Sequence, residues 1–141
     1  MEEEKQKEVQ QKYIELQMLN QQIKQIQKQI ELLENQVMEL TFVSNGLDEL
    51  KNVSSGTEIL VSVGRGIFAK ADIKDTNDLI VNVGADVAVK KDIPGTKNLI
   101  TNQLDEIKKL QQEMLTELQK VAIQASSIEN EINKVISETK K

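Results

Sequence analysis

The sequence lacks several residue types on which many folds and active sites depend. Its 141 residues include no cysteine, no histidine and no tryptophan, and only three aromatic side chains. The absence of cysteine excludes a disulfide framework and thiol chemistry, and it is compatible with a reducing cytosol. So few aromatic residues cannot fill a compact core, whereas a hydrophobic content of 38% is too high for simple disorder. The composition therefore favours long helices that bury a narrow stripe against a partner.

Arginine is scarce as well, with a single residue in the chain, and the 23 acidic residues outnumber the 18 basic ones to give a formal net charge of −5. A phosphate backbone selects for clustered lysine and arginine, so nucleic acid is not an expected partner. No apolar run approaches the roughly 18–20 residues needed to cross a bilayer, and the opening MEEEKQKE is charged rather than signal-like. We therefore expect a cytoplasmic protein that does not insert into membranes.

No arrangement of residues indicates catalysis. Without histidine or cysteine, a catalytic serine or aspartate would need another side chain as its base, held beside it in a pocket. The pair of long helices that is derived below from the heptad repeats offers no such pocket. Gly64-Arg65-Gly66 is not followed by the Gly-Lys-Ser/Thr of a phosphate loop, so it is read as a turn. The acidic run 2–4 is read as the solvated start of a helix rather than a cation site. We expect no enzyme activity, no cofactor and no metal.

What the sequence does contain is two long heptad repeats. In the N-terminal segment, two series of apolar residues recur every seven positions and alternate at spacings of three and four. They are Val9, Leu16, Ile23, Ile30 and Val37, and Leu19, Ile26, Leu33, Leu40 and Leu47. Such a narrow seam, with Gln, Lys, Glu and Asn between its members, is typical of a coiled coil.

The C-terminal segment repeats this pattern, with Gln111 interrupting one of its two series. The series are Ile100, Ile107, Met114, Val121, Ile128 and Val135, and Leu104, Leu118, Ala125 and Ile132. Both helices should run to roughly 65–75 Å at about 1.5 Å per residue. Matched lengths allow them to close into an antiparallel pair, with facing residue numbers that add up to about 149.

The segment boundaries are marked by turn-forming residues. Ser54-Ser55-Gly56 ends the first helix, with Gly56 suited to the left-handed conformation, and Thr96 after Pro94-Gly95 is a plausible N-cap. Residues 44–46 soften the first helix without breaking it. The predicted organisation is an N-terminal helix at 1–53, a β segment at 54–95 and a C-terminal helix at 96–141.

The β segment contains two copies of one sequence motif. Residues 60–73 read LVSVGRGIFAKADI and residues 80–93 read IVNVGADVAVKKDI. Each copy alternates apolar and other residues on both sides of a glycine-bearing turn, which predicts two consecutive β-hairpins joined by the polar turn 75–78. Isolated hairpins are barely stable and leave unpaired edges, so we expect hairpins from several chains to pair into an intersubunit β-barrel. The residues expected to carry this oligomerisation are Ile59, Val61, Val63, Ile67, Val81, Val83, Val87 and Val89.

The predicted fold is therefore α+β, with two β-hairpins inserted between the helices of a long antiparallel coiled coil. This plan, with the duplicated Val-Gly phrase in about 140 residues, resembles the prefoldin alpha-class subunit of archaea. The most specific local matches are EILVSVGRG from Glu58 and IVNVGADVAVKK from Ile80. The beta class has a single hairpin, so the duplication points to the alpha class.

The resemblance implies a hexamer of two alpha and four beta subunits, whose strands form a double barrel and whose six coiled coils project from it. It implies an ATP-independent chaperone that captures non-native proteins at the coiled-coil tips and transfers them to a group II chaperonin. The tips would bring residues near both termini together as the client-binding site. These residues are Val9, Tyr13, Leu16, Leu19, Ile128, Ile132, Val135 and Ile136.

Three alternatives remain open at this point. The apolar residues near the termini could simply complete the coiled-coil seam, with no client role. The whole protein could be a tethering coiled coil that its hairpins merely oligomerise, although a tether has no need of apolar residues as near the C-terminus as Val135 and Ile136. The chain could also assemble alone into rings or filaments.

Overall fold

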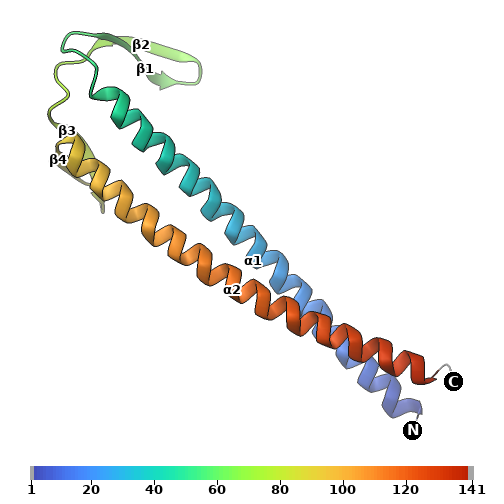
Figure 1. Cartoon of the computed structure of the whole chain (residues 1–141). Coiled ribbons are helices and arrows are strands. Elements are labelled where there is room, and N and C mark those ends of the chain that lie inside the picture. Colours follow the sequence, from blue (N-terminus) through green and yellow to red (C-terminus); the bar gives the residue numbers. More distant parts are fainter. Residues whose placement is uncertain (1, 140–141) are drawn as a thin grey trace. The chain divides into compact units, whose positions relative to one another are not determined.

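The computed structural model describes residues 2–139 and contains two helices and four strands in this part of the chain. Their order is α1 (Glu2–Leu50), β1 (Glu58–Gly64), β2 (Ile67–Asp72), β3 (Leu79–Gly84), β4 (Val87–Lys91) and α2 (Ile93–Thr139) (Figure 1). Each neighbouring pair of strands forms an antiparallel two-stranded sheet of its own. The predicted plan of helix, two hairpins and helix is confirmed.

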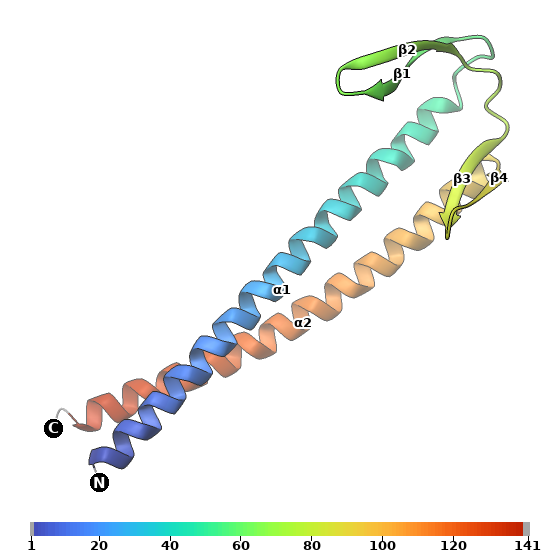
Figure 2. The ribbon, with the colours of Figure 1, turned by 180° about the vertical axis from the view of Figure 1, so that it is seen from behind.

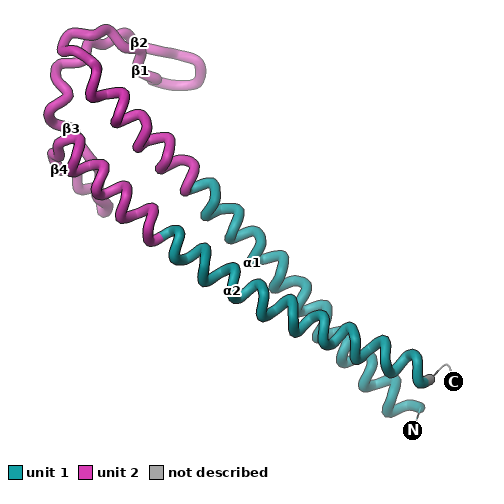
Figure 3. Tube along the Cα trace, viewed as in Figure 1, with its two compact units in different colours: residues 1–36, 107–141 teal, residues 37–106 magenta. Residues whose placement is uncertain are grey.

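The chain divides into two compact units, coloured separately in Figure 3. The first unit contains the N-terminal part of α1, as far as Gln36, and the part of α2 that begins at Ile107. These helical segments run antiparallel, which brings the start of α1 close to the end of α2. The second unit spans Val37–Glu106 and contains both hairpins with the adjoining ends of the helices.

The first unit is held together by the predicted seam. Along α1 the less exposed residues recur at alternating spacings of three and four, from Val9 to Leu33, while their neighbours are exposed. On α2 the seam is covered more deeply, because Val121, Ala125 and Ile132 are buried. The narrow width of this stripe explains why the two helices need each other, since neither helix has a wider apolar face for a larger core.

The second unit has a small core of its own. Leu47 of α1 packs with Ile93 and Ile100 of α2, and four partly buried leucines surround them. One of these leucines, Leu79, is the first residue of β3, so the second hairpin is attached to the helices through this core. Figure 2 shows this hairpin beside the first turns of α2. In contrast, every residue of β1 is exposed.

The two hairpins share a register but differ at their turns. Val61 pairs with Ala69 in the first hairpin, and Val81 pairs with Val89 in the second, with a bulge two residues later in each. The first turn places Gly66 at a φ of 70°. The second turn places Ala85 at 50° and Asp86 at 60°, which is the left-handed region at two successive non-glycine residues. The second turn is therefore the more strained of the two.

The ends of the helices agree with most of the predicted signals. Helix α1 continues through residues 44–46 to Leu50, and Gly56 adopts a φ of 87° in the turn that follows. The N-cap prediction was wrong, because α2 begins at Ile93 and the Asp92 carboxylate accepts the Gly95 N–H at 2.8 Å. Thr96 lies within the first turn, where its hydroxyl donates to the Asp92 carbonyl at 2.8 Å.

Candidate functional site

The candidate site lies on the first unit, between the start of α1 and the end of α2. Here α1 and α2 enclose a pocket of about 610 Å³ on the side of the helix pair, which we call the terminal pocket. It is lined by Glu2, Lys5, Gln6, Val9, Gln10, Tyr13, Val135 and Ile136. Four of these residues are apolar, with Val9 and Tyr13 on α1 and Val135 and Ile136 on α2, and the other four are polar or charged. Such a mixed lining is typical of pockets that bind ligands.

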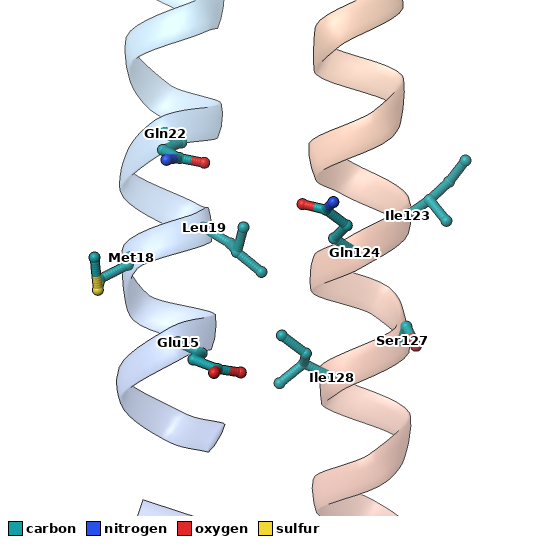
Figure 4. Close-up of a pocket in the computed structure, with 8 residues that line it drawn as sticks. All are labelled: Glu15, Met18, Leu19, Gln22, Ile123, Gln124, Ser127 and Ile128. Atoms are coloured by element: carbon teal, nitrogen blue, oxygen red, sulfur yellow. The ribbon is translucent and has the colours of Figure 1, made fainter. Parts of the chain in front are cut away.

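A second pocket, of about 540 Å³, lies further along the same unit and is called the inner pocket below (Figure 4). Leu19 and Ile128 point into the space between the helices, whereas Met18 and Ile123 point away from it. The lining residues are Glu15, Met18, Leu19, Gln22, Ile123, Gln124, Ser127 and Ile128. Thus the same two helices provide two apolar depressions separated by a short stretch of seam.

The structure distributes the predicted client-contact residues over these two pockets. Four of them line the terminal pocket, and Leu19 with Ile128 lines the inner one. Leu16 is partly buried in the seam, and Ile132 is 3% exposed, so the latter packs between the helices. Tyr13 is the most accessible of the eight, with half of its surface exposed.

The terminal pocket brings Tyr13 and Ile136 together, as the predicted sum of about 149 requires, but the two ion pairs between the helices have smaller sums. A sum of 149 would place residue 137 opposite Lys12, but the partner of Lys12 is Glu131. In the second unit the same sum would place residue 101 opposite Asp48, but its partner is Lys97. The observed pairs are four to six residues away from the prediction, which is between one and two helical turns.

Two exposed side chains beside the inner pocket were not among the predicted client contacts. Met18 is 59% exposed and Ile123 is 69% exposed. Both fall outside the two heptad series, so the periodicity that identified the seam gave no reason to select Ile123. The side chain of Met18 is an unbranched thioether. An unbranched thioether adapts well to irregular apolar surfaces, which is consistent with its exposed position.

An ion-pair cluster lies between the two pockets. The Lys12 ammonium is 3.3 Å from a carboxylate oxygen of Glu8 on its own helix and 3.3 Å from one of Glu131 on α2. The hydrogen bond to Glu131 is the main cause that raises the pKa of Lys12 above its ordinary value of 10.5. Position 12 is seven residues before Leu19, so a lysine occupies a seam position in this turn. We call Lys12, Glu8 and Glu131 the clasp.

The second unit carries the residues predicted to oligomerise. Six of the eight are exposed, whereas Val81 and Val89 are partly buried where the second hairpin meets the helices. Three more apolar residues of the hairpins, which were not among the predicted oligomerisation residues, are exposed as well. These are Leu60, Phe68 and Ile80. Because neighbouring strand residues point to opposite faces, the first hairpin presents apolar side chains on both of its faces.

Within residues 2–139, no group of acidic, histidine or cysteine side chains is placed to hold a metal ion. Neither helix in this part of the chain contains an apolar stretch that is long enough to cross a membrane. The notable features of the surface are therefore apolar depressions and exposed strands. Large exposed apolar areas of this kind are typical of the class of proteins that bind other polypeptides.

The comparisons with known proteins agree with this class. Residues 19–138 match the sequence model of the family described as prefoldin subunit. The chain is 31% identical over 127 residues to prefoldin subunit alpha of Methanococcus vannielii, covering 90% of this chain and 85% of the relative. It is 28% identical over 133 residues to prefoldin subunit alpha of Archaeoglobus fulgidus, covering 89% and 92% of the two chains.

A solved structure shows the same fold. A chain in the cryo-EM structure of filamentous PFD from Methanocaldococcus jannaschii superposes with a TM-score of 0.60 at 22% identity. The match covers 86% of this chain and 95% of that one. This chain belongs to the prefoldin subunit family, and it is of the archaeal alpha type. It is therefore a subunit of a chaperone, and the prefoldin family is a family of chaperones rather than enzymes.

Proposed function

We propose that this chain is a subunit of an ATP-independent chaperone that holds non-native proteins at the ends of its helices. The observation that supports this best is the terminal pocket, which Val9 and Tyr13 of α1 line together with Val135 and Ile136 of α2. Folded proteins bury such side chains, so a pocket of this kind selects segments that are exposed only before folding is complete. Client segments then pass to a group II chaperonin, which competes for them without nucleotide hydrolysis by this chain.

Each arm should bind weakly. A few hundred Å² of apolar contact gains several kcal/mol at about 25 cal/mol per Å², and ordering the client removes much of this gain. Several arms acting on one client increase the effective affinity while each contact stays reversible. The function therefore depends on assembly, for which the exposed hairpins are the proposed interface.

We propose that the hairpins pair with those of beta-class subunits in a hexamer of two alpha and four beta chains, and that their strands form an intersubunit barrel. The exposed valines and isoleucines of β1 to β4 support this, because they need a cover that this chain does not provide. Val61→Lys on the exposed β1 strand should lower the mass of the native complex, as measured by native mass spectrometry. Lys24→Glu, on an exposed position of α1, is the control and should leave the mass of the complex unchanged.

The holding function is tested by aggregation suppression without ATP. The native assembly should suppress aggregation of a chemically unfolded protein, and removal of residues 1–19 and 126–141 should abolish suppression while the assembly stays intact. Full suppression by the truncated assembly would reject the terminal pocket as the client site. A lack of suppression by the intact assembly would favour a tethering role.

We also propose a cytoplasmic location. A chaperone that holds unfolded proteins must share the compartment in which those proteins occur. Fractionation of source cells, followed by immunodetection of this chain, should find it with cytoplasmic proteins. Recovery in the membrane fraction would contradict this proposal.

A further inference from the structure

The clasp interrupts the coiled-coil seam at a specific place. Lys12 occupies a seam position between Val9 and Leu16, and its side chain is only 21% exposed. A lysine among apolar seam residues weakens a coiled coil but fixes its pairing, provided that the ammonium finds a counter-charge. Here two carboxylates supply it, one from each helix.

The clasp lies between the two pockets, so it can influence how the helix ends close around the terminal pocket. The terminal pocket takes its α2 lining from Val135 and Ile136, beyond Glu131, while the inner pocket takes Ile128 from the near side. Towards the N-terminus from Lys12, Val9 is the one apolar seam residue of α1, because the seam positions before it hold Lys5 and Glu2. The closing of the helix ends around the terminal pocket therefore depends on few apolar contacts of α1 and, in addition, on the clasp.

We propose that the clasp is a positioning cluster that sets how often the helix ends separate and expose the apolar lining of the terminal pocket to a client. This inference rests on the proposed function, and it adds that the clasp regulates how often the client site is accessible. The cluster is well suited to this control because Glu8 and Glu131 are each more than half exposed. Exposed ion pairs contribute little and are screened by salt, so the helix ends are held closed only weakly.

Two substitutions should act in opposite directions. Glu131→Gln removes the counter-charge on α2 and leaves Lys12 in the seam, so the helix ends should open more often. Lys12→Leu makes the seam continuous and apolar, so they should open less often. The salt dependence of opening distinguishes the clasp from residues that only support the fold, because salt screens a contact between charges and not an apolar seam.

The experiment uses the native assembly, purified through a tag on this chain. Hydrogen–deuterium exchange of peptides from residues 2–13 reports opening without any client, and binding of a reduced, carboxymethylated lactalbumin reports capture. Glu131→Gln should increase both exchange and capture by about two- to fivefold, the range expected for an exposed ion pair. Lys12→Leu should decrease both. Raising the salt concentration should increase exchange in the unmodified chain and change it little in Glu131→Gln.

Two controls complete the design. Lys12→Arg keeps the charge and should preserve exchange, and Asp48→Asn removes the cross-helix ion pair of the other unit without affecting residues 2–13. Equal exchange in all variants, or a change of the same sign in Glu131→Gln and Lys12→Leu, would reject the proposal that the clasp controls opening. If exchange follows the expected pattern but no variant binds the unfolded protein, the clasp stands and the proposed function fails.

Discussion

The ammonium of Lys97 on α2 donates a hydrogen bond to the carboxylate of Asp48 on α1, and this contact joins the two helices beside the core of the second unit. Lys51 approaches the same carboxylate at 3.7 Å. The arrangement is the clasp with its charges reversed, since here one carboxylate is shared between two lysines. The hydrogen bond from Lys97 is the main cause that holds the pKa of Asp48 below its ordinary value of 3.8.

This lowered pKa predicts a pH dependence of stability. A carboxyl group with a lower pKa in the folded state stabilises that state above pH 3.8, and the contribution is lost as the pH falls through the folded-state pKa. Asp48→Asn should therefore lower the melting temperature slightly at neutral pH. The difference from the unmodified chain should disappear in the acid range below 3.8.

Thermal unfolding followed by circular dichroism at a series of pH values measures this difference. The matched control is Asp105→Asn, which makes the same change of charge on the exposed surface of α2. A stability difference for Asp48→Asn that stays constant down to the lowest pH would show that the carboxylate charge is not responsible.

Two glycines should respond in opposite ways to the same substitution. Gly46 lies inside α1, and a Cβ added there would meet no atom within 4 Å. Gly46→Ala should raise the free energy of unfolding by about 0.5–1 kcal/mol, because alanine loses less backbone entropy in a helix. Gly56 has the same open surroundings but a φ of 87°, so Gly56→Ala should lower the free energy of unfolding by about 1 kcal/mol or more. Urea denaturation of the two variants in parallel measures both signs.

The N-cap of α2 gives a third prediction. Asp92→Ala removes the acceptor of the Gly95 N–H and should lower the free energy of unfolding by about 1 kcal/mol. Asp92→Ser retains a capping oxygen and should restore most of the loss. Urea denaturation distinguishes the two variants, and equal losses in both would mean that the side-chain oxygen does not cap the helix.

The strained second turn gives a fourth prediction. Asp86→Gly should raise the melting temperature, because glycine adopts a φ of 60° without the steric cost that a Cβ adds, about 1 kcal/mol. Arg65→Gly is the control, since Arg65 occupies the corresponding turn of the first hairpin without a positive φ. Calorimetry of the two variants should show a gain for the first only. A gain of equal size in both would attribute the effect to the loss of a side chain.

The sequence predicted the elements of this fold because each has a period of its own. The heptad spacing from Val9 to Leu33 and the alternation around Gly64 and Gly84 are local patterns, and local geometry is sufficient to convert them into helices and strands. The family resemblance was readable for the same reason, since its matching phrases lie in the two hairpins.

The errors arose where local pattern does not determine the structure. A heptad repeat selects the face of each helix but not the turn of its partner, so the pairing of Lys12 with Glu131 could not be read from it. Asp92 was overlooked because the Pro94-Gly95 pair was taken as a turn, although proline is tolerated in the first turn of a helix. Ile123 lies outside both heptad series, and its exposure beside the inner pocket follows from three-dimensional placement.

The full exposure of β1 has a consequence for how much of this chain a cell can tolerate. A strand with accessible apolar faces and an open edge pairs with whatever strand it meets first. Surplus copies would therefore stick to one another or to unrelated proteins. If partner chains cover β1 as proposed, production of this polypeptide has to match production of those partners, and an excess of it would favour aggregation.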